Sequence, residues 1–246
     1  MQTLGIDIGG TGIKGALVDV ETGQLVTDRV RLLTPEGAKP ADVAKVVQEL
    51  VVHFEYKGVV GCGFPAVIRH GIAHSAANVH QSWIGTDVNQ LLSEATGCQV
   101  FSLNDADAAG IAEMKFGAGK QLEKGVAMIL TLGTGIGTAI FSDGHLLPNT
   151  EFGHLKIRGK DAEFRASDAT RQKKRLPWKK YSKRLQEYLD EMEALFSPDL
   201  IIIGGGLSKS HDKFFPHLEV KAKIVPAELL NQAGIVGAAI FASQQG

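Results

Sequence analysis

The sequence has 246 residues, 44% of them hydrophobic, and a formal net charge of −1 at pH 7. That length accommodates one large domain or two small ones around a sizeable core. The near-neutral charge excludes a general attraction to nucleic acid or to membrane surfaces. The first residues lack the basic and then apolar pattern of a secretory signal, and two cysteines are too few for a disulfide framework. We therefore expect a cytoplasmic protein with no nucleic-acid or membrane partner.

The first fifteen residues predict a phosphate-binding turn. Apolar residues alternate with smaller or polar ones from Leu4 to Ile8, which predicts a β-strand that ends at a pair of glycines. Glycine lets backbone N–H groups approach an anion that a β-carbon would keep away. A neighbouring acid could hold a hydrated metal ion, although a glycine pair alone also fits an ordinary tight turn. The candidate residues are Asp7, Gly9, Gly10, Thr11 and Lys14.

The stretch from Gly10 to Gly15 also fits the dinucleotide-binding pattern G-x-G-x-x-G. That pattern requires a helix to begin at the last glycine. Residues 16–26 instead predict a strand, a turn at Glu21–Gly23 and a second short strand. A hairpin at this place argues against a dinucleotide fold and favours a phosphate loop between two strands. The sequence also contains no Walker A motif.

The same plan recurs in the second half of the chain. An apolar strand is predicted at 126–132, followed by a glycine-threonine turn and another strand at 139–141. Two glycine-rich turns in matching surroundings are much stronger support for phosphate binding than one. A third apolar strand, 200–203, leads into a further glycine turn. The candidate donor-binding residues here are Thr131, Gly133, Thr134, Gly135, Gly137, Gly204 and Gly205.

Another predicted strand, 100–103, delivers Asn104 and Asp105 at its carboxyl end, ahead of a helix at 108–116. Proteins of the α/β class place reactive groups at this position. Either residue could instead cap the helix, and the residues alone leave both interpretations open. Further helices are predicted at 41–54, from an Asp87 cap to Thr96, and at 235–243, where small residues would permit close packing.

Polar residues that could hold a sugar follow the second glycine turn. Glu151, His154 and Glu163 offer hydrogen-bond acceptors and a donor of the kind that bind hexose hydroxyls. They would equally suit loops that face water. Downstream, residues 171–184 hold eight Lys or Arg and no acid. Such a run is usually a solvated helix face, and a groove for a long polyanion is the alternative.

The motif from Asp7 to Lys14 resembles the first phosphate motif of the ROK sugar kinases, which belong to the actin-like ATPase superfamily. The resemblance continues along most of the chain. It implies an α/β fold of two actin-like (ribonuclease H-like) lobes, each with a mixed sheet, and a cleft between them. We expect a smaller N-terminal lobe from residues 1–103 plus 235–246, and a larger C-terminal lobe from residues 104–234.

The resemblance also implies roles for single residues. Asp105 matches the family's catalytic base, and the turn at Gly204 would pass beside adenosine in ATP-using relatives. Mg²⁺ would be held mainly through Asp7 and water. The substrates would be glucose and either polyphosphate or ATP, and the protein would be a homodimer. The implied sugar-binding residues are Gly63, Pro65, Asn78, Asn104, Asp105, Glu151, His154 and Glu163.

The chain departs from most of the family at one segment. Most members carry a zinc-binding cysteine cluster between the positions of His154 and Glu163, whereas residues 155–162 contain no cysteine. Because structural zinc needs thiolate or imidazole ligands, usually four, we expect none here. The short segment resembles the subgroup that phosphorylates glucose from polyphosphate, which favours the polyanion interpretation of residues 171–184. The alternatives are an ATP-dependent hexose kinase and a non-catalytic sugar-sensing protein. Regulators of the family carry a helix-turn-helix domain ahead of the first strand, and the start of this chain predicts none.

Overall fold

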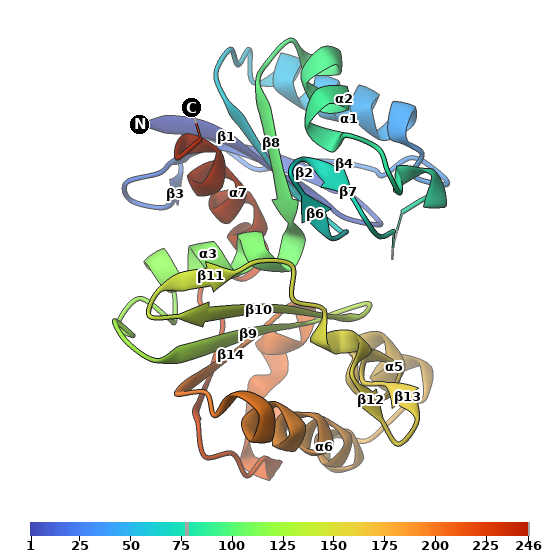
Figure 1. Ribbon diagram of the computed structural model, residues 1–246, viewed down its shortest axis with the longest axis vertical. Helices are drawn as coiled ribbons and strands as arrows, with labels where there is room; N and C mark the ends of the chain where they lie inside the picture. Colours follow the sequence, from blue (N-terminus) through green and yellow to red (C-terminus); the bar gives the residue numbers. More distant parts are fainter. Residues whose placement is uncertain (77–78, 246) are drawn as a thin grey trace. The chain divides into compact units, whose positions relative to one another are not determined.

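The computed structural model describes residues 1–76 and 79–245 (Figure 1). The chain separates into two compact units, Met1–Ala112 with Gln232–Gly246 (unit 1) and Glu113–Asn231 (unit 2). Each unit contains one mixed main sheet with helices packed on it, so the predicted α/β class with two mixed sheets is confirmed. Among the described residues, none of the helices is both long and apolar enough to cross a membrane.

The main sheet of unit 1 has the strand order β3-β2-β1-β5-β8, with β4 also pairing β2. Strands β1 and β2 form an antiparallel hairpin, while β1, β5 and β8 run parallel. Side chains from alternate positions of β1 pack against α1 and α2, and the opposite positions face α7. The elements are β1 (Gln2–Ile8), β2 (Ile13–Asp19), β3 (Gln24–Leu25), β4 (Val30–Leu32), α1 (Pro40–His53), β5 (Val60–Phe64), β6 (Ile68–Arg69), β7 (Ile72–Ala73), α2 (Val88–Thr96), β8 (Val100–Asn104) and α7 (Ala233–Ser243).

Glycines allow α7 to lie unusually close to its neighbours. A β-carbon added at Gly5 of β1 would overlap the carbonyl of Ile235, and one at Gly61 of β5 would overlap the carbonyl of Ala238. From the helix itself, a β-carbon at Gly237 would overlap the carbonyl of Ala108. The close packing predicted for this helix is confirmed, and three glycines maintain it.

The main sheet of unit 2 has the order β11-β10-β9-β14-β15. Strands β9 and β10 form an antiparallel hairpin, and β9, β14 and β15 run parallel. The long helix α6 buries Tyr181, Leu185 and Tyr188 in the core of this unit. The elements are β9 (Val126–Leu132), β10 (Ile136–Ser142), β11 (His145–Leu147), β12 (Lys156–Ile157), β13 (Lys160–Asp161), α4 (Glu163–Ala166), α5 (Asp168–Lys173), α6 (Trp178–Phe196), β14 (Leu200–Gly204) and β15 (Lys223–Pro226).

The two units repeat one plan, as the sequence predicts. The main sheet of each unit contains a hairpin of two seven-residue strands as its first two strands in the chain, and each turn is closed by a backbone hydrogen bond of 3.1 Å. In the first turn Gly9 N–H donates to the Gly12 carbonyl, and in the second Gly133 N–H donates to the Gly135 carbonyl. Strand β2 occupies the place where a dinucleotide-binding fold would have a helix, so that alternative is excluded.

The unit boundaries differ from the expected lobe boundaries. The first crossing falls at Ala112–Glu113, nine residues later than expected, and unit 1 is slightly the longer of the two. The reason is helix α3 (Asp105–Phe116), whose residues up to Ala112 belong to unit 1, with Ala108 against Gly237. Its residues from Glu113 on belong to unit 2. The second crossing falls at Asn231–Gln232, three residues before the expected one, just ahead of α7.

A buried carboxylate fixes the end of α3 within unit 2. Glu113 is 1% exposed and accepts three backbone hydrogen bonds of 2.8–3.1 Å, from the N–H groups of Ala118, Glu228 and Leu229. Hydrogen bonds to a buried ion are among the stronger ones in proteins, so this side chain ties the 228–229 loop to α3. Sequence reasoning missed it, because a glutamate near a helix end looks like an ordinary surface residue.

Candidate functional site

Parallel pairing in unit 1 brings several predicted residues to one edge of the sheet. Asp7 of β1 lies in register with Gly63 of β5, and Phe64 of β5 lies in register with Asn104 of β8. Pro65 follows directly after β5. The carboxyl ends of parallel strands are where α/β proteins bind ligands. Asn78 lies outside the described residues.

Asp7 lies between the Lys14 ammonium group and the amino end of α7. Its Oδ2 pairs with Lys14 Nζ at 3.1 Å, and the two residues are cross-strand partners in the β1–β2 hairpin. A β-carbon added at Gly234, in the first turn of α7, would lie 3.1 Å from Asp7 Cγ. The amino end of a helix carries partial positive charge and favours an anion there. A partly exposed carboxylate is a suitable oxygen ligand for Mg²⁺, which usually takes one or two carboxylates and completes its shell with water and phosphate oxygens.

Strand β4 and Thr34, two residues after it, hold the first glycine turn in place. Arg31 donates to the carbonyl of Thr11 at 3.1 Å, and Thr34 Oγ1 donates to the carbonyl of Gly9 at 2.5 Å. A β-carbon at Gly12 would lie 2.5 Å from Arg31 Nε, so glycine is needed where the guanidinium crosses the turn. Sequence reasoning missed Arg31 and Thr34. Only the pairing of β4 with β2 reveals them, and three residues are too few to predict that strand.

Asn104 caps the helix that follows it. Its Oδ1 accepts from the N–H groups of Ala106 and Asp107 at 2.9 and 3.1 Å, and its Nδ2 donates to the Ala66 carbonyl at 3.1 Å. Asn104 is buried, and it caps the helix as one of the two interpretations predicts. Asp105 is the first residue of α3, which begins three residues earlier than predicted. One of its oxygens accepts from Ala106 N–H at 2.8 Å, and the residue is partly exposed.

The strand ends of unit 2 gather the second set of predicted residues. Thr131 of β9 lies in register with Gly137 of β10 on one side and with Gly204 of β14 on the other. The turn that carries Thr134 therefore lies at the same end of the sheet as the Gly204 turn. Gly205 has a φ of +76°, and a β-carbon there would lie 2.5 Å from the Leu132 carbonyl oxygen. Its backbone thus crosses directly over the end of β9.

The predicted sugar-binding residues of unit 2 pack against this turn. A β-carbon at Gly135 would overlap the Oε2 of Glu163. A β-carbon at Gly153 would overlap the carbonyl of Ile136, which fixes the segment holding Glu151 and His154 on β10. Unit 2 therefore brings its glycine turn and these polar side chains together.

Hydrogen bonds and burial shape the polar cluster of unit 2. His154 Nδ1 lies 3.1 Å from Asp161 Oδ2, and its Nε2 lies 3.8 Å from Glu151 Oε2. Partial desolvation raises the pKa of Glu151, His154 lowers it, and the nearby Glu163 raises it further. The hydrogen bond from Lys156 is the main cause that lowers the pKa of Asp161. Asp161, which sequence reasoning missed, thus orients His154.

His154, Asp161 and Glu163 could together hold a metal ion, since one ligand atom of each lies within 4.8 Å of the others. The Lys156 ammonium group already neutralises Asp161 and would compete with a cation there. The expectation that the segment binds no zinc stays a prediction.

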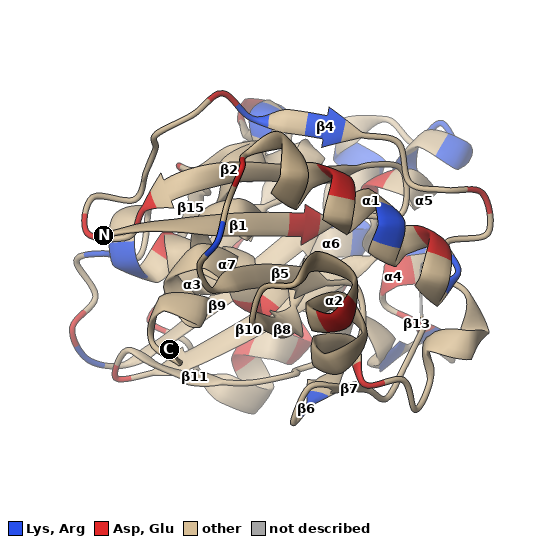
Figure 2. Ribbon diagram, turned by 90° about the horizontal axis from the view of Figure 1, so that it is seen from above, with Lys and Arg blue, Asp and Glu red and all other residues tan. Residues whose placement is uncertain are grey.

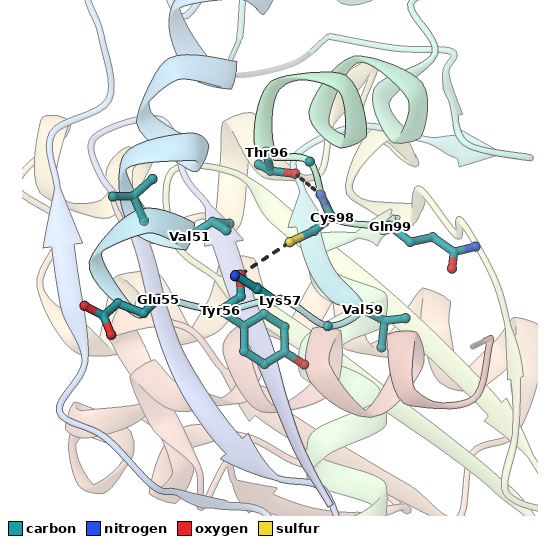
Figure 3. Close-up of a pocket in the computed structure, with 11 residues that line it drawn as sticks. Val51, Glu55, Tyr56, Lys57, Val59, Thr96, Cys98 and Gln99 are labelled. Atoms are coloured by element: carbon teal, nitrogen blue, oxygen red, sulfur yellow. Dashed lines mark hydrogen bonds between the residues drawn. The ribbon is translucent and has the colours of Figure 1, made fainter.

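A cavity of about 1110 Å³ lies at the other end of the unit 1 sheet (Figure 3). Its lining includes Val59 and Gln99, which precede β5 and β8, so it opens at the amino ends of the parallel strands. In it, Cys98 Sγ donates to the Tyr56 carbonyl at 3.6 Å, and burial raises the pKa of this thiol. The cavity contains none of the predicted site residues.

Comparison with known proteins identifies the family. A profile of the ROK family matches residues 3–167. The chain belongs to the ROK family. It is 49% identical over 237 residues to a protein named polyphosphate glucokinase from Mycobacterium tuberculosis (strain CDC 1551 / Oshkosh), and the match covers 96% of this chain and 89% of the relative.

Solved structures share the fold. The inorganic polyphosphate/ATP-glucomannokinase of Arthrobacter sp. strain KM superposes with a TM-score of 0.96 at 48% identity, covering 100% of this chain and 99% of that one. A ROK glucokinase from Streptomyces griseus, solved with glucose and AMPPNP, superposes with a TM-score of 0.85 at 22% identity, covering 99% and 100%. The resemblance stated from sequence motifs is thus confirmed.

Proposed function

We propose that the protein is a polyphosphate-dependent glucokinase, which transfers a phosphoryl group from polyphosphate to the 6-hydroxyl of glucose. The observation that carries this proposal is the match to a protein named polyphosphate glucokinase, which is 49% identical and covers 96% of this chain. The two glycine-threonine turns and the acid at the start of α3 support it, because phosphoryl transfer depends mainly on positioning and on charge neutralisation.

Unit 1 supplies the base in this proposal. Asp105 accepts the proton of the 6-hydroxyl as that oxygen attacks the terminal phosphorus, and the shortened polyphosphate leaves. Asn104 accepts from the backbone N–H groups of Ala106 and Asp107, which fixes the first turn of α3 and with it the position of Asp105. Gly63, Pro65 and Asn78 are the further sugar contacts that the family resemblance implies.

The donor is held by backbone amides. The N–H groups of Gly10, Thr134 and Gly135 and the hydroxyls of Thr11 and Thr134 bind phosphate oxygens in this proposal, and Gly9 closes the first turn through its bond to the Gly12 carbonyl. Lys14 adds positive charge. Mg²⁺, held through Asp7 and water, would neutralise charge that develops on the donor. The remaining donor-binding residues of the proposal are Thr131, Gly133, Gly137, Gly204 and Gly205.

Unit 2 supplies sugar contacts. Glu151 and Glu163 accept hydrogen bonds from sugar hydroxyls, and His154 donates or accepts according to its tautomer. The pKa of Glu151 is raised above the usual 4.5 of a glutamate. As the pH falls, this side chain therefore becomes protonated before an ordinary glutamate does. Because a protonated carboxyl accepts less well, we infer that glucose binding weakens as the pH falls toward that raised value.

ATP is the second candidate donor. The Arthrobacter protein is described as a polyphosphate/ATP-glucomannokinase, and it covers the whole of this chain at 48% identity. ATP and mannose are therefore the alternatives to polyphosphate and glucose that deserve a direct comparison. A homodimer and a cytoplasmic location stay predictions.

A parallel assay separates these possibilities. Purified protein is given glucose or mannose with either ATP or polyphosphate, and hexose 6-phosphate is measured over time. We expect glucose 6-phosphate from polyphosphate with a kcat/KM at least equal to that with ATP. Activity with ATP alone would make the protein an ATP-dependent hexokinase of the family. Sugar binding without turnover of any donor would make it a sugar-sensing protein.

A further inference from the structure

A short helix connects the second glycine turn with a group of cations in unit 2. The N–H of Ala169, in the first turn of α5, donates to the Gly133 carbonyl at 3.0 Å. Helix α5 then runs six residues to Lys173. At 1.5 Å per residue the helix is roughly 9 Å long. One end of α5 therefore touches the turn, and the other end carries Lys173 and Lys174.

Other cations surround the far end of α5. The helices α5 and α6 and the strand β13 each pack on α4, and Lys and Arg are found along α5 and α6 (Figure 2). Lys174 Nζ donates to the Phe164 carbonyl of α4 at 3.3 Å. Partial desolvation, and then the nearby charges of Arg184, Lys160, Arg165 and Lys173, lower the pKa of Lys174. The distal cluster is defined as Lys160, Lys173, Lys174 and Arg184, with Arg165 beside it.

The carboxylates of this region are already engaged. Glu187 pairs with both Arg158 and Arg165, and Asp161 pairs with Lys156. Asp168 pairs with Arg171 at 3.0 Å. Within the described residues, no carboxylate forms an ion pair with a member of the distal cluster. Four like charges without counter-charges repel one another, so the site would gain from an added polyanion.

The structure assigns a path to the phosphoryl donor: we propose that a long polyphosphate leaves the Gly133–Gly135 turn along α5 and that the distal cluster binds its far phosphates. This inference rests on the proposed function, and it deepens it by naming the residues that select long donors. The repeated charge of a condensed phosphate chain suits cations spaced away from the turn, whereas a nucleotide triphosphate has no phosphates left at that distance.

The path uses one flank of the basic block. Arg184 lies one turn before Glu187, which binds Arg165 of α4, so this flank of α6 faces the distal cluster. Lys183 lies one turn before Gln186, which donates to the Glu219 carbonyl on the other flank. The basic run 171–184 is therefore divided between two faces, which the sequence alone does not distinguish.

Paired substitutions test the path. Lys173→Gln/Lys174→Gln removes two charges of the distal cluster, and Lys221→Gln/Lys223→Gln removes two exposed charges elsewhere in unit 2. The KM values for long-chain polyphosphate, tripolyphosphate and ATP are measured at low and moderate salt. We expect the first variant to raise the KM for the long chain roughly three- to tenfold at low salt, because each exposed ion pair contributes modestly. Its KM for tripolyphosphate and ATP should stay within twofold, and its salt dependence should be shallower.

Several outcomes would overturn the path. An equal rise in KM for all three donors would mean that Lys173 and Lys174 attract every phosphate donor alike and do not bind the far phosphates of a long chain. An equal rise in the KM for long-chain polyphosphate in Lys221→Gln/Lys223→Gln, or in Lys179→Gln/Lys183→Gln on the other flank, would show that the distal cluster is not the binding face. Tighter binding of single-stranded DNA than of polyphosphate of equal charge, measured directly, would mark a nucleic-acid surface. If the unaltered protein uses ATP and no polyphosphate, the proposed function fails instead.

Discussion

Replacing Asp105 with asparagine is expected to lower kcat by about 10²–10⁴-fold while glucose still binds. General-base assistance is typically worth that factor, and the amide cannot accept the hydroxyl proton. Asparagine keeps the size of the side chain and an oxygen that can accept the hydrogen bond from Ala106 N–H. The start of α3 should therefore remain formed. Steady-state kinetics and calorimetric titration with glucose measure the two quantities separately.

Asp87→Asn is the matched control for this variant. Asp87 caps α2 in the same unit, where its Oδ1 accepts from Gln90 N–H at 2.8 Å, and asparagine caps helices about as well as aspartate. We expect the control to keep both its activity and its melting temperature. If Asp105→Asn turned over close to the parent rate, the assignment of the base would be wrong. A variant that lost glucose binding as well would show that Asp105 mainly positions the sugar.

Replacing Gly237 with alanine is expected to destabilise the protein by about 1–3 kcal/mol, the usual cost of overpacking. Helix propensity alone predicts the opposite, since alanine is favoured over glycine by about 1 kcal/mol inside a helix. The added β-carbon, however, would overlap the backbone carbonyl of Ala108, which cannot rotate away as a side chain could. Overpacking of a close backbone contact exceeds the propensity gain, so α7 must shift. Thermal and denaturant unfolding measure the change.

Gly15→Ala provides the comparison. Gly15 lies in β2 of the same unit, and its β-carbon would meet its nearest neighbours at 3.4–3.5 Å, an ordinary contact distance. We expect that variant to change stability by less than about 1 kcal/mol. Equal stabilities for the two variants would mean that α7 tolerates displacement, and a gain for Gly237→Ala would mean that propensity outweighs packing at this position.

The hairpins and the glycine turns were predictable because local sequence encodes them. Alternation of apolar residues identifies strands, and paired glycines mark where each strand ends, so β1 and β9 and their turns follow from the sequence. The cap of α2 at Asp87 follows from residue type alone. Near-continuous apolar runs likewise identify β14 as a buried parallel strand.

The remaining features depend on contacts between distant residues. Arg31 reaches the first turn because β4 pairs with β2, and Glu113 meets the 228–229 loop from more than a hundred positions away. Neither residue differs locally from a surface charge. The crossing between units at Ala112–Glu113 likewise depends on distant contacts, since one helix, α3, carries residues of both units.

Transfer of labelled phosphate tests the central claim most directly. The protein, freed of nucleotide, is incubated with glucose, Mg²⁺ and polyphosphate carrying ³²P throughout the chain, and the sugar phosphate is isolated. The account predicts label on the 6-oxygen of glucose without any added nucleotide. Label that reaches glucose only after ADP or ATP is supplied would contradict it.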